Sequence, residues 1–277
     1  MIGAIIGDIV GSQFKTNEYK SKKFEFWTKE YSITVNTIMV LAVAKAIMLT
    51  EEKREAPMSD YNEKDIANLK AMTIQSMQEM GRKYPLCEDI QWSINKKQAS
   101  LHNGDCNGAA IWASAVGFTA RSREEVCLLA KTITGITHDN LETLKAAEAS
   151  AMAVFMAQQG CTKGEIRQMI TDEYYPLDFT IEELREYDQC DNSCQDLVPQ
   201  GIKVFLESID FEDAIRTAVS IDGDRAILAA FVGSIAAAFY GVPKAFEEKA
   251  RTYLDEGLLR IYNEWCAFNQ QKKAKLF

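Results

Sequence analysis

The sequence has few of the features that would divide the chain or tie it to a membrane. Only five prolines occur, and they stand between segments of regular hydrophobic spacing. No stretch reaches the about 18 uncharged apolar residues typical of a membrane-spanning helix. The apolar N-terminus has no basic segment before it, and Asp8 interrupts it, which is unlike a signal peptide. We therefore expect a soluble, cytoplasmic protein with no membrane partner.

Clusters of positive charge and paired cysteines are also missing. The formal net charge is −9 at pH 7, with acidic and basic residues interleaved, which argues against a nucleic-acid partner. The seven cysteines lack the spacing of a disulfide framework. Cys190 and Cys194 lack the second pair of ligands that a zinc site needs. We expect reduced thiols.

Helical periodicity is what the sequence does contain, without a convincing alternating strand or a fixed repeat. Residues 37–49 are apolar on nearly every face, which predicts a central buried helix. From Phe246 to Trp265 apolar residues keep a three-to-four spacing, which predicts a further helical segment. We expect one all-α domain over residues 1–277.

Short motifs predict how helices begin and how two of them pack. Three pairs fit capping boxes, in which a hydroxyl and an acid three residues later satisfy each other's backbone N–H: Ser122 with Glu125, Thr162 with Glu165, and Thr180 with Glu183. Glycines recur every four residues near the N-terminus, at Gly3, Gly7 and Gly11. Such a stripe lets a second helix approach closely.

Several short segments occur in the order of known motifs: residues 3–12, 107–117, 137–145, 193–199, 211–216, 218–224 and 228–236. Together they resemble the ADP-ribosylglycohydrolase family, relatives of the dinitrogenase reductase-activating enzyme. The resemblance implies an all-α, single-domain helical bundle. It also implies hydrolysis of the bond between ADP-ribose and a modified side chain, with two divalent cations, usually Mg²⁺, at the centre of the bundle.

The resemblance also identifies the metal-binding positions, and most of them have lost their acid. Lys15, Val35, Asn36 and Ala226 replace four of the five family acids, Asp224 keeps the fifth, and Ile227 replaces a threonine beside it. Mg²⁺ prefers charged oxygen ligands, so neutral oxygens from Thr34 and Asn36 do not balance two divalent cations. We therefore expect no resident metal and no hydrolysis by the two-metal mechanism of the family.

For the ligand, the resemblance implies contacts from Asn107, Gly108 and His138, and from position 112, where Trp112 replaces the family's arginine. His138 either donates to a diphosphate at a helix start or caps its own helix. The Asn107–Gly108 pair either approaches a ligand closely or only begins a helix. The sequence leaves both choices open.

Two charged groups near the expected centre need partners. A buried Asp8 must be hydrogen-bonded, which favours a structural cap over catalysis. We expect Thr34, Asn36, Asp224 and Lys15 to converge, with the Lys15 ammonium pairing with Asp224 in the space of the lost metals. Arg225 is the less suitable cation, because successive helical residues face different ways.

These expectations favour a pseudoenzyme that keeps the glycohydrolase fold and binds ADP-ribose, a related nucleotide, or a protein partner such as an ADP-ribosylated protein. A divergent hydrolase with Asp224 or Asp8 as general base is one alternative. An interaction protein with a filled cleft is another. The sequence leaves the ligand and the oligomeric state open.

Overall fold

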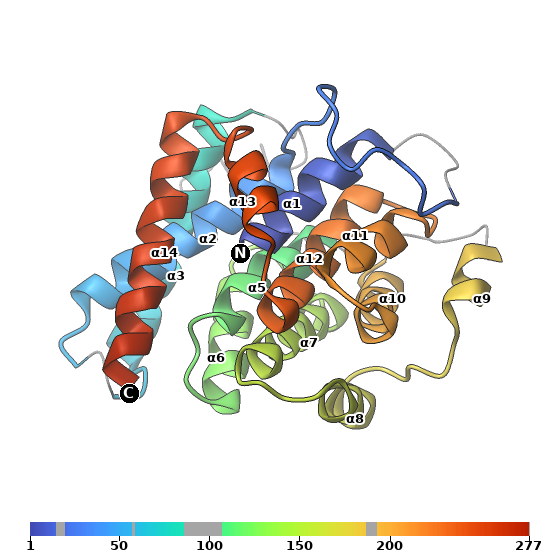
Figure 1. Cartoon of the computed structure of the whole chain (residues 1–277). Coiled ribbons are helices and arrows are strands. Elements are labelled where there is room, and N and C mark those ends of the chain that lie inside the picture. The colour runs from blue at the N-terminus through green and yellow to red at the C-terminus, as the bar shows by residue number, and fades with distance from the viewer. Residues whose placement is uncertain (15–19, 57–58, 86–106, 187–192, 277) are drawn as a thin grey trace.

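The structure is a computed structural model that describes residues 1–14, 20–56, 59–85, 107–186 and 193–276 (Figure 1). Within these ranges every regular element is helical. The elements are α1 (Ile2–Gly11), the short 3₁₀ helix η1 (Ser12–Phe14), α2 (Val35–Lys53), α3 (Glu63–Lys83), α5 (Asn107–Gly117), α6 (Arg123–Thr134), α7 (Leu141–Gln158), α8 (Lys163–Glu173), α9 (Ile181–Glu186), α10 (Cys194–Glu207), α11 (Phe211–Val219), α12 (Arg225–Tyr240), α13 (Lys244–Arg251) and α14 (Glu256–Leu276). The all-α prediction is confirmed.

Helices α1 and α12 pack with their backbones in contact, and the glycine stripe makes this possible. A Cβ atom placed on Gly7 would lie 1.9 Å from the carbonyl oxygen of Ala229. One placed on Gly11 would lie 2.4 Å from the carbonyl oxygen of Arg225. Any larger residue at these positions forces the two helices apart. The predicted close approach is confirmed, and its partner is α12.

Helix α2 is the predicted central helix. Within residues 37–49 every side chain is buried except Lys45 and Leu49, which are half-buried. The Lys45 ammonium lies 2.8 Å from a carboxylate oxygen of Glu79 on α3. Helices α3, α5 and α14 all pack against α2, and Figure 1 shows α14 beside α2 and α3. An apolar helix needs such cover on several sides.

All three predicted capping residues begin a helix, and one of the three capping boxes is incomplete. Two capping boxes form in full, at Thr162 with Glu165 and at Thr180 with Glu183. At the third, Ser122 accepts the Glu125 N–H at 3.2 Å. The Glu125 carboxylate accepts the backbone N–H and the Nε–H of Arg121 instead. The acid therefore serves an ion pair rather than the reciprocal half of the box.

The C-terminal periodic segment divides into two helices, α13 and α14. The Asp255 carboxylate accepts the Leu258 N–H at 2.8 Å and so begins a new helix. Ala250, Leu258 and Trp265 are all buried. The apolar spacing continues across the break because both helices turn an apolar face to the same core.

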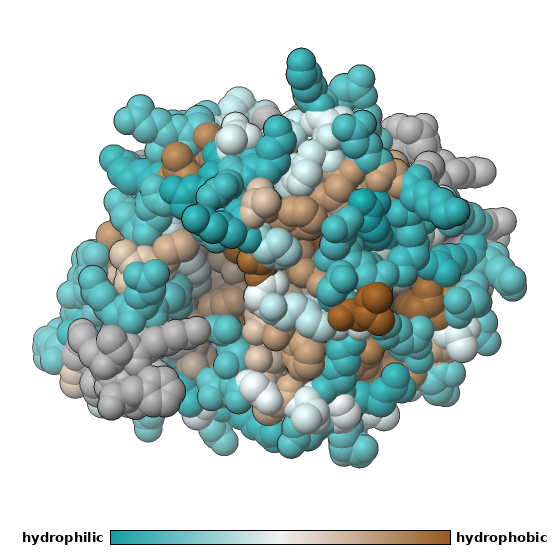
Figure 2. All heavy atoms as spheres, in the orientation of Figure 1, coloured by the Kyte–Doolittle hydropathy of each residue, from teal (hydrophilic) through white to brown (hydrophobic). Residues whose placement is uncertain are grey.

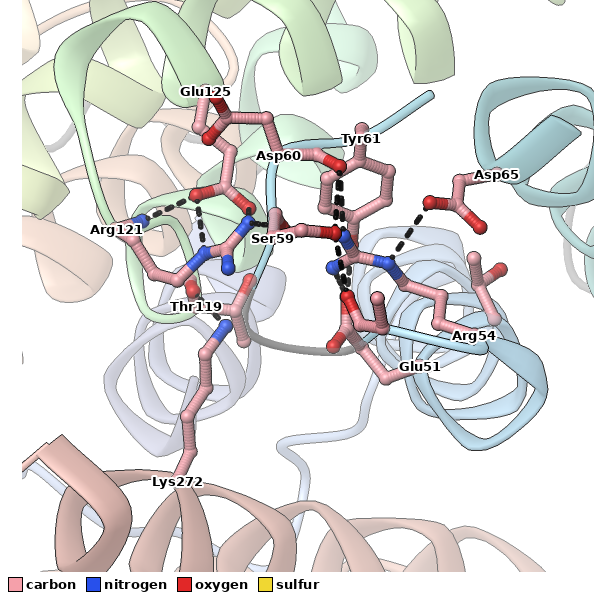
Figure 3. Close-up of polar contacts among 12 residues, drawn as sticks. Glu51, Arg54, Ser59, Asp60, Tyr61, Asp65, Thr119, Arg121, Glu125 and Lys272 are labelled. Carbon is pink, nitrogen blue, oxygen red and sulfur yellow. Dashed lines mark hydrogen bonds and ion pairs between the residues drawn. The ribbon is translucent and has the colours of Figure 1, made fainter. Parts of the chain in front are cut away.

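A cluster of charged and polar groups joins the α2–α3 connection, the α5–α6 connection and the end of α14 (Figure 3). Arg54 donates from Nη1 to Glu51 at 2.9 Å and from Nε to Asp65 at 3.2 Å. The carbonyl oxygen of Ser59 accepts from Nη2 of both Arg54 and Arg121, at 2.7 and 2.6 Å. We call the following residues the Arg54 cluster: Glu51, Arg54, Ser59, Asp65, Thr119, Arg121, Glu125 and Lys272.

Hydrophilic residues cover most of the face in Figure 2, and more hydrophobic residues form a band through its middle. Beneath the surface, most of the buried apolar side chains of the described residues belong to one continuous core. Among the described residues, no helix combines the length and the hydropathy needed to cross a bilayer.

Candidate functional site

Asp8 lies on α1 and directs its carboxylate at the start of α2. Its Oδ2 accepts the Thr34 N–H at 2.8 Å, the Thr37 N–H at 3.3 Å and the Thr37 hydroxyl at 2.6 Å. Its Oδ1 accepts the Thr34 hydroxyl at 2.5 Å and the Asn36 amide at 3.4 Å. The first N–H groups of a helix have no partner within it. Asp8 supplies acceptors for α2 from another helix, which is the capping role expected from the sequence.

The environment of Asp8 is buried and its donors are neutral. The side chain is 0% exposed, and this burial raises the pKa of its carboxyl above the ordinary value. Hydrogen bonds from Thr34, Thr37 and Asn36 act in the opposite direction and offset only part of the effect of burial on the pKa. Among the described residues, the hydrogen-bond donors to Asp8 are hydroxyl, amide and backbone groups.

Asp224 stands at the start of α12 and caps that helix. Its Oδ1 accepts the backbone N–H groups of Ala226 and Ile227, each at 3.1 Å. The side chain of Asp224 is half-buried, and that of Ala226 is buried. A capping aspartate stabilises the helix through these donors and through the helix dipole.

Both helix starts meet the C-terminal half of α1. Asp8 bonds to the first residues of α2, and Gly11 contacts Arg225 and Ala226 at the start of α12. Asp8 and Gly11 are three residues apart, which is about 4.5 Å along a helix. The predicted convergence of Thr34, Asn36 and Asp224 therefore has a physical basis in α1. Lys15, the fourth residue of that prediction, lies outside the described residues, as does its proposed pairing with Asp224.

Arg225 is a buried cation at the start of α12. Its side chain is 3% exposed, and its guanidinium donates to the carbonyl oxygens of Val219 and Phe14, each at 3.0 Å. Nη2 also lies 3.3 Å from Oδ1 of Asp222. These contacts do not join Arg225 to Asp224: Arg225 is the first residue of α12, and its long side chain reaches back past the helix start.

The donor set at the family's metal positions does not fit two divalent cations. Asp224, the family acid that is kept, already accepts two backbone N–H groups through Oδ1. The Asn36 amide donates to the Thr34 hydroxyl and to Asp8, a neighbouring acid that already accepts five hydrogen bonds. Val35, Ala226 and Ile227 have no side-chain ligand atom. Within the described part of the chain, no group of three or more His, Cys, Asp or Glu side chains has metal-binding geometry. Hard cations take several charged oxygens, which these residues do not supply.

Two of the expected ligand-contact residues, Gly108 and His138, lie beside a third, Trp112. The Trp112 indole covers Gly108, so a Cβ on Gly108 would lie 2.8 Å from the ring. Trp112 is 6% exposed, and its Nε1 is buried without a hydrogen-bond partner in the described residues. The rings of Trp112 and His138 are 6.3 Å apart between centroids. Asn107 begins α5, and its side chain lies outside the described part.

His138 does not cap its own helix. The cap of α7 is Asn140, whose side-chain oxygen accepts the N–H groups of Glu142 and Thr143 at 2.8 and 3.4 Å. His138 is buried, and its Nδ1 lies 2.8 Å from the Thr137 hydroxyl. Of the two interpretations left open by the sequence, helix capping is excluded.

Comparison with known proteins agrees with this architecture. The family model described as ADP-ribosylglycohydrolase matches residues 1–271. A solved structure described as an "ADP-ribosylglycohydrolase-related protein complex" is similar, with a TM-score of 0.59 and 17% identity over 95% of this chain and 96% of that chain. At that identity the similarity shows the fold alone. Among proteins with curated descriptions, none matches the chain by sequence. Because the family model spans nearly the whole chain, this protein belongs to the ADP-ribosylglycohydrolase family.

Proposed function

We propose that this protein binds ADP-ribose or a related nucleotide, free or attached to a protein partner, and does not hydrolyse it by the family's two-metal mechanism. The observation that carries the proposal is the side-chain set at the family's metal positions, where Val35 and Ala226 have no ligand atom and the Asp224 carboxylate already accepts two backbone N–H groups. Asp8 does not replace a lost ligand: an ionised carboxylate offers about four lone-pair sites, and Asp8 accepts five hydrogen bonds.

The start of α5 supports the binding half of the proposal. A buried Trp112 N–H without a partner among the described residues is a donor suited to an oxygen acceptor. The first N–H groups of α5 add donors and a positive dipole end at the same place. The His138 ring lies 6.3 Å from the Trp112 ring between centroids. These groups match the hydroxyl and phosphate oxygens of a nucleotide.

The proposal treats residues 1–277 as one domain and assigns the protein to the cytoplasm. Reduced thiols support that location, since Cys127, Cys161 and Cys266 form no disulfide in the described part of the chain.

Calorimetric titration with ADP-ribose, with and without Mg²⁺, tests binding. We expect the same affinity in both conditions, because no residue set for Mg²⁺ contributes. Trp112→Phe keeps an aromatic ring but removes the N–H, and should weaken binding by about fivefold to tenfold. Trp265→Phe is the matched control, since Trp265 is buried on α14, and it should leave the affinity unchanged.

Absence of binding in either condition would contradict the proposal and favour the alternative of an interaction protein with a filled cleft. ADP-ribose binding that requires Mg²⁺ would contradict the part of the proposal that excludes a metal, and would favour the alternative of a divergent hydrolase.

A further inference from the structure

The buried guanidinium of Arg225 is surrounded by oxygen atoms from three parts of the chain. Val219 is the last residue of α11, Phe14 is the last residue of η1, and Asp222 precedes the Asp224 cap. The first two supply carbonyl oxygens and the third supplies a carboxylate. Carbonyl and carboxylate oxygens are also the ligands that hard divalent cations take. The Arg225 guanidinium thus places a positive charge of the protein itself among these oxygen atoms.

The contacts of the Arg225 guanidinium lie next to positions where the family has metal-binding acids. Phe14 directly precedes position 15, and Arg225 directly follows Asp224. The guanidinium therefore links two of the segments where the family has metal-binding acids. It is ionised at every pH at which the protein folds, and its flat fork of donors suits several acceptors at once.

We propose that Arg225 is the resident cation of this centre: it holds η1 to the α11–α12 connection and keeps divalent cations away from Asp222 and Asp224. The proposal deepens the proposed function, because it assigns the exclusion of metal to a particular side chain as well as to lost acids. A fixed positive charge 3.3 Å from the Asp222 carboxylate, on the residue next to Asp224, repels an incoming divalent cation and uses oxygens that the cation would bind.

Charge and hydrogen bonding can be separated by substitution. Arg225→Gln and Arg225→Met are both neutral, and only the Gln variant keeps donors for the carbonyl oxygens. Arg225→Lys keeps the charge with fewer donors. Mn²⁺ serves as the probe, followed by electron paramagnetic resonance of the free ion and by paramagnetic broadening of amide signals.

We expect both neutral variants to bind Mn²⁺ at least about tenfold more tightly than the unaltered protein. Arg225→Lys should behave as the unaltered protein does. Adding Asp222→Asn to Arg225→Gln should abolish the gain, which locates the ion. Lys45→Gln removes a positive charge from the Lys45–Glu79 pair and controls for net charge.

Folded neutral variants that bind Mn²⁺ no better than the unaltered protein would overturn the proposal. So would an Arg225→Lys variant that gains affinity to the same extent. If neither neutral variant folds, the unaltered protein decides: broadening of the Phe14 and Val219 amide signals by millimolar Mn²⁺ overturns the proposal, and their persistence supports it. Failure of the proposed function is detected separately, as absence of ADP-ribose binding or as release of ADP-ribose from modified side chains by the unaltered protein.

Discussion

Two regions of the molecule bury carboxylates in opposite ways. One is the Asp8 centre, which consists of Asp8 with its donors Thr34, Asn36 and Thr37, and the other is the Arg54 cluster. The Asp8 carboxylate accepts hydrogen bonds from neutral groups at the start of α2. In the Arg54 cluster each buried acid faces a cation, with Arg54 between Glu51 and Asp65 (Figure 3). The difference shows that the chain uses paired charges where helices are joined. At its centre, where the family gathers acids around metal, it buries one acid among neutral groups.

Burial has its expected electrostatic effects at the edge of the cluster. The Tyr61 ring lies 3.9 Å from the Arg54 guanidinium carbon, and burial together with Glu51 raises the pKa of the Tyr61 hydroxyl. Lys272 of α14 donates to the Thr119 carbonyl, and burial lowers the pKa of its ammonium. A substitution in the Arg54 cluster should therefore change the electrostatic environment of several ionisable groups at once.

Removing a cation from the cluster should have the largest effect on stability. Arg54→Ala leaves Glu51 and Asp65 buried without their partner and should lower the free energy of unfolding by about 3–5 kcal/mol. Equilibrium urea unfolding measures it. Arg54→Lys keeps the charge but not the fork of donors, and should cost less. A loss from Arg54→Ala below about 1 kcal/mol, the range of exposed pairs, would remove the contrast between the two regions.

A change at the centre should cost less, because the donors there are neutral. Asp8→Asn keeps the shape of the side chain but points an N–H₂ group at donors from Thr34 or Thr37. We expect a loss of about 1–3 kcal/mol in the free energy of unfolding, measured under the same conditions. A loss larger than that of Arg54→Ala would reverse the comparison.

The pH dependence of stability should sharpen the contrast. The pKa of Asp8 is raised in the folded protein, so the Asp8 contribution is fully present below the unfolded pKa of about 3.9 and is lost as pH rises through the folded pKa. The unaltered protein should therefore gain stability relative to Asp8→Asn as the pH falls from neutral. Urea unfolding of both proteins across this range measures the difference. A difference that shrinks on acidification would mean that the pKa is lowered.

The smallest effect is expected at an ion pair outside both regions. The Lys45 and Glu79 side chains are 22% and 53% exposed, so solvent screens their attraction. Lys45→Gln should change the free energy of unfolding by about 0–1 kcal/mol. A thermal or urea unfolding curve suffices, and a larger loss would show that α2 and α3 depend on this pair.

Local spacing was enough to predict much of the fold. The glycine stripe and the apolar run of 37–49 indicated close packing and a central helix, because both depend on the period of a helix. The break between α13 and α14 was missed because apolar spacing continues across it. Asp255 is a suitable residue to begin a helix, and its carboxylate accepts the Leu258 N–H. The signal was weak because Leu258, three residues later, is not the acid that completes a capping box.

The site was less predictable because its contacts join distant residues. Asp8 within an apolar run indicated a buried, hydrogen-bonded acid, but its partners Thr34 and Thr37 are 26 and 29 residues away. Arg225 reaches Phe14 across 211 residues. The side chain of Arg225, the first residue of α12, passes the helix end, and spacing along one helix does not predict such a contact. Gly108 and His138 each lie beside Trp112, and their predicted role in binding a ligand stays a prediction. The buried Trp112 N–H without a partner among the described residues had no signal in the sequence.

Release of ADP-ribose from ADP-ribosylated arginine and serine peptides, in the presence of Mg²⁺, tests the central claim most directly. The arrangement of Asp8 and Arg225 predicts release no faster than in the absence of protein, at any Mg²⁺ concentration. Release that rises with Mg²⁺ and is lost in Asp224→Asn would contradict the claim and show that the family's hydrolysis persists in this chain.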